Sequence, residues 1–293
     1  MIRVNKAGGA GEWPATTCTA RRNPFNSMAA SGASSGHTVR LQIGGCFNRT
    51  RVQPVGGQAA RLILLMVGMG YNPCAMPHYI DLETWPRRAV FEFYLPFDKP
   101  YFNVCTRLDM TALRTRLRER PHASVSLAYH YFALRAANEI ESFRYRLRDG
   151  QVVVHDVIHG GTTIMLPNET FTLAYFEYDD DFDKFMTAAE AAVKEVLSGD
   201  GGWRPNARDD MIHFTTLPWL SFTSFSHARN WSSEDSVPKI AFGKFTEENG
   251  RTMLPFSVEV HHALMDGLHV GRYVARLQEV LSNPETYLTS ENL

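Results

Sequence analysis

Cysteine is scarce in the part of the chain that carries recognisable patterns. Three of the four cysteines, Cys18, Cys46 and Cys74, lie among the first 75 residues, which leaves Cys105 alone in the remainder. A single thiol forms neither a disulfide framework nor a cysteine-rich zinc site. A body of about 218 residues can bury a sufficient core without covalent cross-links. We therefore expect a protein of the reducing cytoplasm.

Long apolar runs are also missing. The apolar run at residues 62–67 is much shorter than the ~20 residues that span a bilayer. Some sixty residues precede it, which excludes a signal peptide. We therefore expect no membrane association.

Acidic residues are nearly absent from residues 1–75, which contain eight Lys or Arg and one acidic residue, Glu12. The remainder has 22 basic and 30 acidic residues, and this excess of acid argues against nucleic acid as a partner. Residues 1–75 show no sustained helical or strand period. We expect them to be disordered, or a non-native extension upstream of a start at Met76; a targeting arm or basic tether is the alternative. Residues 76–293 are expected to form a single domain.

The most informative pattern is a strand, a polar turn and a helix near the C-terminus. Residues 256–260 alternate apolar and polar side chains, the period of a half-buried strand, and after Gly267 the apolar residues follow a helical stripe. The sequence HHxxxDG (261–267) stands between them. Imidazole at the end of a strand suits proton abstraction near neutral pH. A chance pair of surface histidines is the alternative interpretation.

Other elements can be placed more coarsely. Residues 81–94 begin as a helix and continue as an aromatic stretch in which Phe91 and Phe93 are expected to point the same way. Arg148-Asp149-Gly150 predicts a hairpin. The further predictions are strands at 101–109, 162–165 and 170–178, and helices at 110–119, 124–140 and 180–198.

The HHALMDGLHVGR sequence resembles the active-site motif of the chloramphenicol acetyltransferases, the trimeric, coenzyme A-dependent type. Two further segments are similar to the same family, WPRRAVFEFY at 85–94 and PWLSFTSF at 218–225. The resemblance covers residues 76–293. It implies an α/β fold (an α+β two-layer sandwich), with a mixed β-sheet and helices packed on one face. It also implies a homotrimer with active sites between subunits.

The resemblance assigns roles to individual residues. His262 is the catalytic general base, and Thr215 stands where the family has a serine that donates to the tetrahedral oxyanion. The other assignments are structural support of the site (Asp266, Arg87, His261 and Gly267), the acceptor pocket (Tyr94, Phe102 and Phe171) and the phosphate of the coenzyme (Lys244). Arg87 is expected to pair with Asp266.

Several positions differ from the family pattern, and most of them belong to the acceptor pocket. Asp98, Pro100 and His227 replace small or aliphatic residues, and Ala241 replaces a threonine credited with holding a water molecule. The resemblance implies acetyl transfer from acetyl-coenzyme A to a hydroxyl of chloramphenicol, with no metal. The alternatives are an acyltransferase of the same fold that acts on another alcohol, and a non-catalytic trimeric ligand-binding protein.

Overall fold

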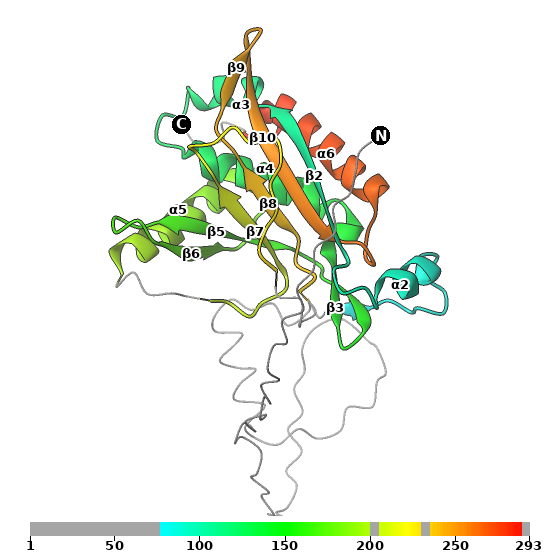
Figure 1. Cartoon of the computed structure of the whole chain (residues 1–293). Helices are drawn as coiled ribbons and strands as arrows, with labels where there is room; N and C mark the ends of the chain where they lie inside the picture. Colours follow the sequence, from blue (N-terminus) through cyan, green and yellow to red (C-terminus); the bar gives the residue numbers. More distant parts are fainter. Residues whose placement is uncertain (1–76, 200–204, 230–234, 289–293) are drawn as a thin grey trace, which may run out of the picture. The chain divides into compact units, whose positions relative to one another are not determined.

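The strand that precedes the HHxxxDG turn, β10 (Arg251–His261), runs through the interior of the larger sheet (Figure 1). The computed structural model describes residues 77–199, 205–229 and 235–288, so the predicted extension at 1–75 lies outside the described residues. Strand β10 pairs antiparallel with β2 (Tyr101–Asp109) on one side and with β8 (Lys239–Phe242) on the other. It therefore delivers the motif to one end of the sheet.

The larger sheet has seven strands in the order β2-β10-β8-β7-β5-β6, with β9 paired to β10 off this path. The β5–β7 and β7–β8 pairs are parallel and the others are antiparallel, which confirms the predicted mixed sheet. The remaining strands are β5 (His159–Met165), β6 (Phe171–Phe176), β7 (Met211–Thr216) and β9 (Thr246–Glu248).

Helices cover one face of this sheet and form the main core with it, as predicted (Figure 1). The helices of this layer are α3 (Thr111–Leu117), α4 (Val125–Asn138), α5 (Phe182–Ser198) and α6 (Gly267–Ser282). Each of the three longer helices begins at a side-chain cap, Ser124 for α4, Asp181 for α5 and Asp266 for α6. These caps satisfy backbone N–H groups that the first helical turn leaves free.

Strand β10 is buried on both faces, so the prediction of a half-buried strand was wrong. Ser257 and Glu259, expected on a solvent face, are 0% and 5% exposed. Ser257 bonds to Asn103 of β2, and the Glu259 carboxylate accepts from the buried guanidinium of Arg229 at 2.7 Å. The alternation of apolar and polar residues in β10 therefore reflects a buried polar layer. Its side chains form hydrogen bonds with other protein side chains instead of with water.

The aromatic stretch before β2 is helical, which corrects the expected common direction of Phe91 and Phe93. Both residues lie in α2 (Arg88–Tyr94), where two residues are about 200° of rotation apart. Phe91 is consequently 2% exposed and Phe93 is 61% exposed.

A small second sheet supports α2, and the sequence predicted its hairpin but not the third strand, β1. Strand β4 (Gln151–Val154) lies between β1 (His78–Tyr79) and β3 (Tyr145–Arg148). The predicted hairpin joins β3 to β4, with positive φ at Asp149 (51°) and Gly150 (71°), as a two-residue turn requires. Side chains of this sheet pack with Phe91 and with Ala263 and Leu264 of the HHxxxDG turn. The second core cluster thereby ties α2 to the motif.

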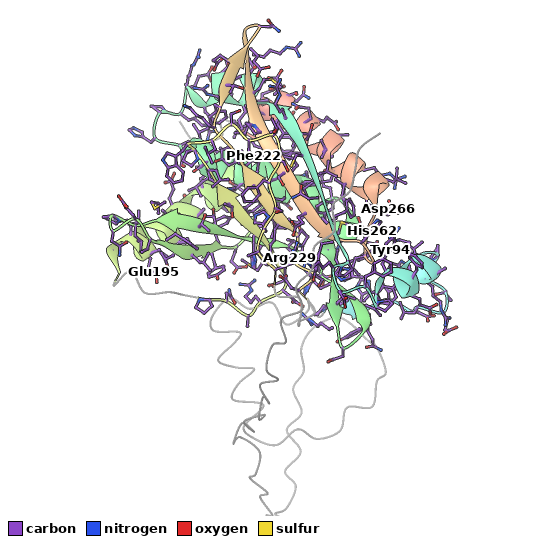
Figure 2. All side chains as sticks on the ribbon, viewed as in Figure 1. Tyr94, Glu195, Phe222, Arg229, His262 and Asp266 are labelled. Atoms are coloured by element: carbon purple, nitrogen blue, oxygen red, sulfur yellow. The ribbon has the colours of Figure 1, made fainter. Side chains whose placement is uncertain are left out.

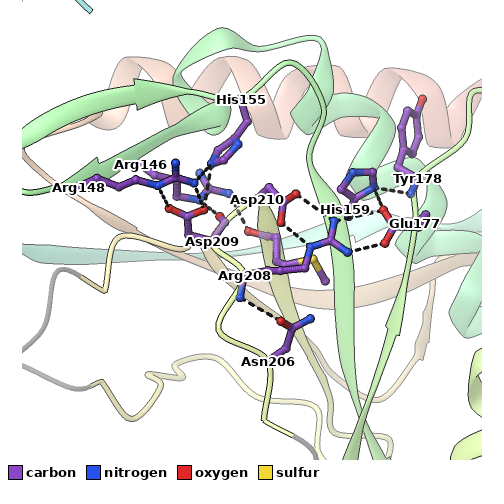
Figure 3. Close-up of polar contacts among 11 residues, drawn as sticks. Arg146, Arg148, His155, His159, Glu177, Tyr178, Asn206, Arg208, Asp209 and Asp210 are labelled. Atoms are coloured by element: carbon purple, nitrogen blue, oxygen red, sulfur yellow. Dashed lines mark hydrogen bonds and ion pairs between the residues drawn. The ribbon is translucent and has the colours of Figure 1, made fainter. Parts of the chain in front are cut away.

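A network of charged groups fixes the start of β7 (Figure 3). The Arg146 guanidinium is fully buried and donates to the backbone carbonyls of Phe143 (2.9 Å), Tyr145 (2.6 Å) and Met211 (2.7 Å). Burial lowers the pKa of Arg146 to about 10, so it stays protonated at neutral pH. Arg148 donates to both carboxylate oxygens of Asp209 at 2.7 and 2.6 Å. These contacts hold the small sheet against the larger one.

Candidate active site

The turn after β10 is held by its backbone and by buried side chains. The His262 N–H donates to the Pro100 carbonyl at 2.6 Å, just before β2 begins. Ala263, Leu264 and Met265 are all 0% exposed. Two adjacent strands and two core clusters therefore fix the position of the His262 backbone.

Two aromatic rings hold the His262 imidazole. The Tyr94 ring is stacked on it, with centroids 3.9 Å apart and an interplanar angle of 9°, and the Phe102 ring lies 4.7 Å away at 49°. Figure 2 shows Tyr94, His262 and Asp266 together at this end of the sheet. The His262 Nδ1 atom is buried without a hydrogen-bond partner among the described residues, whereas Nε2 is not buried in this way. Nε2 is thus the nitrogen available to a substrate.

Asp266 connects the turn to α2. Its carboxylate accepts from the Leu268 N–H at 3.0 Å and from Arg87 Nη1 at 2.5 Å, so the predicted Arg87–Asp266 pair is present. Burial alone raises the pKa of Asp266, but the bond from Arg87, the His269 charge and the Leu268 N–H together hold it below the usual value. The pair ties α2, and with it Tyr94, to the start of α6.

His269 is half-buried in the first turn of α6. Its Nδ1 atom lies 2.9 Å from Asp266 Oδ1 and 3.2 Å from the Asp266 backbone nitrogen, which completes a capping box. A polar residue three positions after an Asp N-cap is the sequence signal that could have indicated it.

His261 faces a different environment from its neighbour. It is 4% exposed, and its ring meets the Tyr101 ring edge-on at 5.1 Å. Burial, with a further contribution from the charge of Arg229, lowers its pKa to about 4. His261 is therefore a neutral, packed residue at physiological pH, in agreement with a supporting role.

Comparison with known proteins identifies the family. The model of the chloramphenicol acetyltransferase family matches residues 77–278. The chloramphenicol acetyltransferase of Streptomyces acrimycini is 35% identical over 72% of this chain and 97% of its own length. The chloramphenicol acetyltransferase 2 of Escherichia coli is 34% identical over 70% and 96%. The chain belongs to the chloramphenicol acetyltransferase family.

Solved structures agree with this membership. A chloramphenicol acetyltransferase structure that is 29% identical superimposes with a TM-score of 0.65 and covers 70% of this chain and 100% of that one. A dihydrolipoamide acetyltransferase of Azotobacter vinelandii, 19% identical, gives a TM-score of 0.50 over 69% of this chain and 88% of that one, and shares the fold.

Within one chain, the residues assigned from the chloramphenicol acetyltransferase family do not all meet. Thr215 of β7 is opposite Ala241 of β8, which is opposite Ser257 of β10. Ser257 precedes His262 by five residues, or about 17 Å of strand, and Thr215 lies two strands further across, about 10 Å. The single chain thus brings His262 together with Tyr94, Phe102, Asp266 and Arg87, and leaves Thr215 apart.

The remaining assigned residues also lie away from His262 or show no direct role beside it. Lys244 is exposed and follows β8 at the end of the sheet opposite His262, and its N–H donates to the Leu220 carbonyl at 2.7 Å. Phe171 begins the edge strand β6 and is 51% exposed. A Cβ at Gly267 would meet nothing within 4 Å, so no steric reason for glycine is present there.

The positions that differ from the family pattern have distinct environments. Pro100 is buried and supplies the carbonyl that anchors His262, a role that the sequence did not suggest, whereas Asp98 is exposed. Ala241 is fully buried. His227 donates its N–H to Glu259 at 3.2 Å, and burial lowers the pKa of its ring to about 4.

Residues 77–199, 205–229 and 235–288 contain neither a candidate membrane-spanning helix nor a cluster of metal-binding side chains. Across these ranges no helix has the length and apolar character needed to cross a membrane. Nor do these ranges hold three His, Cys, Asp or Glu side chains grouped as a metal site.

Proposed function

We propose that this chain transfers an acetyl group from acetyl-coenzyme A to a hydroxyl of chloramphenicol, as a cytoplasmic enzyme. Family membership supports the reaction type, and relatives at 34–35% identity carry that substrate in their names. The observation that carries the proposal is the aromatic clamp on His262, which presents one imidazole nitrogen at the end of a buried strand.

In the proposed mechanism His262 acts as the general base. A hydroxyl is a weak nucleophile, so Nε2 takes its proton as the oxygen attacks the thioester carbonyl. The bond to sulfur then breaks, and the coenzyme A thiolate recovers the proton from the imidazolium. The stacked Tyr94 and Phe102 rings keep the imidazole plane fixed through both proton transfers. The Asp266–Arg87 pair serves the architecture of the turn, and among the described residues neither side chain is hydrogen-bonded to the His262 ring.

The tetrahedral oxyanion needs a donor, and we assign this role to the hydroxyl of Thr215 in a neighbouring copy of the chain. Two observations support a site shared between subunits of a homotrimer. Thr215 of one chain lies two strands across from β10, at the level of Ser257, and so about 17 Å along the strand from His262. Beside His262, the rings of Phe93 and Phe97 contact Tyr94 and are 61% and 46% exposed, so the wall of the site continues onto an apolar surface.

The second candidate function is an acyltransferase that acts on another alcohol. The residues that differ from the family pattern in the acceptor pocket support it. His227 has two ring nitrogens without a hydrogen-bond partner among the described residues. A polar side chain at that place changes which acceptor fits best, while the chemistry at His262 is unaffected.

The test is a screen of alcohol acceptors with acetyl-coenzyme A, in which thiol release is followed for the native protein and for His262→Ala. We expect chloramphenicol to give turnover, and His262→Ala to reduce kcat by about 10²–10⁴-fold, the usual contribution of a general base. The matched control is the adjacent His261→Ala, which should alter kcat much less. Turnover of another alcohol in place of chloramphenicol would favour the second candidate. Equal kcat for native protein and His262→Ala would contradict the mechanism.

A further inference from the structure

The face of the larger sheet that turns away from the helices carries a row of charged and polar side chains. Both neighbours of Glu259 on β10 belong to the core on the helix side, so Glu259 points to the opposite face. In the register of the sheet, Glu259 is opposite Lys239 of β8, which is opposite His213 of β7. Thr215 follows His213 by two residues and points to the same face. Glu259 therefore lies between the level of Thr215 and the turn that carries His262.

Glu259 forms a buried ion pair with Arg229, in the segment between β7 and β8. The Arg229 side chain is 1% exposed and that of Glu259 is 7% exposed, so water screens the pair very little. Arg229 Nε donates to Glu259 Oε1 at 2.7 Å, and Nη2 donates to the Glu259 backbone carbonyl at 3.2 Å. The other carboxylate oxygen of Glu259 accepts the His227 N–H at 3.2 Å. The pair thus fastens the segment around Arg229 directly onto β10.

The Arg229 guanidinium also reaches the turn of the HHxxxDG motif. It lies over the Tyr101 ring, 4.5 Å from the ring centroid, and the Tyr101 ring meets the His261 ring edge-on at 5.1 Å. Tyr101 and His261 are opposite each other in the pairing of β2 with β10. His261 is buried and directly precedes His262. A series of direct contacts therefore runs from Arg229 to the residue before the proposed general base.

The charges of this layer balance. Among the described residues, two cations, Arg229 and Lys239, face two carboxylates, Glu259 and Asp235: Arg229 Nη1 lies 3.2 Å from Asp235 Oδ1, and Lys239 Nζ lies 2.9 Å from Asp235 Oδ2. Removal of Arg229 and Glu259 together would leave Asp235 paired with Lys239, and no charge would be stranded. Replacement of a buried ion pair by uncharged residues of similar volume often leaves stability unchanged. The directed hydrogen bonds of the pair therefore matter more for the arrangement of the two segments than for stability.

We propose that Arg229 and Glu259 are positioning residues for the reaction. Their pair fixes the segment around Arg229 on β10 and, through Tyr101 and His261, the orientation in which His262 presents its imidazole. This inference rests on the function proposed above, because it concerns His262 as the general base. Glu259 precedes His262 by three residues, about 10 Å of strand, so the pair also keeps the charge near the turn balanced.

The first experiment measures kcat/KM against pH for Arg229→Met and Glu259→Gln. Loss of Arg229 leaves a carboxylate near the turn, which favours a protonated imidazole, so the acid limb of the profile should move to higher pH. The shift should reach up to about one pH unit for a charge ~10 Å away. Glu259→Gln leaves the cation and should move the acid limb to lower pH. Arg208→Met is the control, because Arg208 pairs with Glu177 and Asp210 beside β5 and β6 (Figure 3), and its profile should match that of the native protein.

The second experiment separates placement from charge. Arg229→Lys keeps the charge but cannot form the hydrogen bonds of the guanidinium, so kcat should fall about tenfold while the acid limb stays in place. The double variant Arg229→Met/Glu259→Gln restores the charge balance. Its melting midpoint and its acid limb should therefore lie close to the native values, whereas its kcat should remain about tenfold low.

The effect of charge can also be read without turnover. Diethyl pyrocarbonate acylates the neutral imidazole, and mass spectrometry gives the extent of labelling at His262 alone. The pH midpoint of this labelling should move in opposite directions in the two single variants. The inference is overturned if both single variants keep the native midpoint, or if either Arg229→Lys or the double variant retains the native kcat. If the native protein releases no thiol with any alcohol, the proposed function fails instead, and the labelling still tests the pair.

Discussion

The two ends of the larger sheet differ in what they offer a reaction. The end that carries His262 is rich in aromatic rings and has an ion pair that anchors the turn, but Thr215, the assigned oxyanion donor, is not beside it. The end that carries Thr215 has threonine hydroxyls and the exposed Lys244. Each end therefore supplies only part of the assigned set of residues, and the proposed function joins the two parts between copies of the chain.

The largest effect expected from this comparison is recovery of activity in mixed oligomers. Thr215→Ala should lower kcat by about 10²–10³-fold, because one oxyanion donor contributes roughly 2.7–4 kcal/mol. His262→Ala should be at least as damaging. When the two inactive chains are unfolded and refolded together, some sites will combine a native His262 with a native Thr215. Thiol release should then rise well above that of either variant alone.

The control for this experiment is each variant refolded by itself and mixed afterwards without unfolding, which should show no recovery. If co-refolded oligomers form and remain as inactive as the separate variants, the two residues do not serve one site across an interface. Thr215→Ser tests the chemistry itself, because it keeps the hydroxyl and should stay within a few-fold of the native kcat.

The end of the sheet with His262 was predicted from sequence more completely than the other end. The pairing of Arg87 with Asp266 across 179 positions came from the family resemblance, whereas the HHxxxDG spacing itself placed a strand, a turn and a helix correctly. Such patterns succeed because the turn is short and its neighbours are fixed by local periodicity. The wall of the site was harder to foresee. The Pro100 carbonyl that holds His262 is a backbone group, so no pattern of side chains in the sequence predicts this hydrogen bond.

The errors have a common physical origin. Ser257 and Glu259 were expected on a solvent-exposed face because they alternate with apolar residues. Such alternation shows that a side chain is polar, but it does not show whether its hydrogen-bond partner is water or a buried protein group. The partners, Asn103 and Arg229, are far away in sequence.

A smaller effect is expected from breaking the ion pair between Arg87 and Asp266, which connects α2 to the turn. The Arg87 and Asp266 side chains are 16% and 34% exposed, so solvent screens their interaction in part. Either Arg87→Val or Asp266→Asn should lower the free energy of unfolding by about 1–3 kcal/mol and reduce kcat through misplacement of His262. The double variant should recover part of the stability and less of the activity, because the turn still lacks its tether.

A double-mutant cycle, read by melting and by turnover, measures the coupling. Arg88→Val is the matched control, since the ion pairs of this neighbouring arginine among the described residues are with exposed glutamates, Glu83 and Glu92. A coupling energy within ~0.3 kcal/mol of zero would mean that Arg87 and Asp266 act independently. Asp266 would then lose its architectural role, and direct action on the imidazole would have to be reconsidered.

The smallest expected effect is a dependence of the protein's stability on pH, caused by buried histidines. Burial lowers the pKa of His213, His227 and His261 to about 4, and all three lie around the charged groups of Arg229, Glu259, Asp235 and Lys239. Histidines in the unfolded chain titrate near ~6.5, so between about pH 6.5 and 4 the unfolded state binds protons that the folded state does not. Stability should therefore be complete above pH 6.5 and decline as the pH falls toward 4.

The low pKa of Asp266 makes a contribution of the same sign in a different window, because that carboxylate loses its stabilising charge only as the pH falls below about 4. Melting midpoints at intervals from pH 7.5 to 4.5 should thus report the histidines, with up to about 1.4 kcal/mol per pH unit for each. His261→Phe removes one of them and should flatten the curve, whereas the exposed-site variant His122→Phe should not. A curve that stays level down to pH 4.5 would mean that these rings exchange protons freely in the folded chain, and that the polar layer on β10 is open to water.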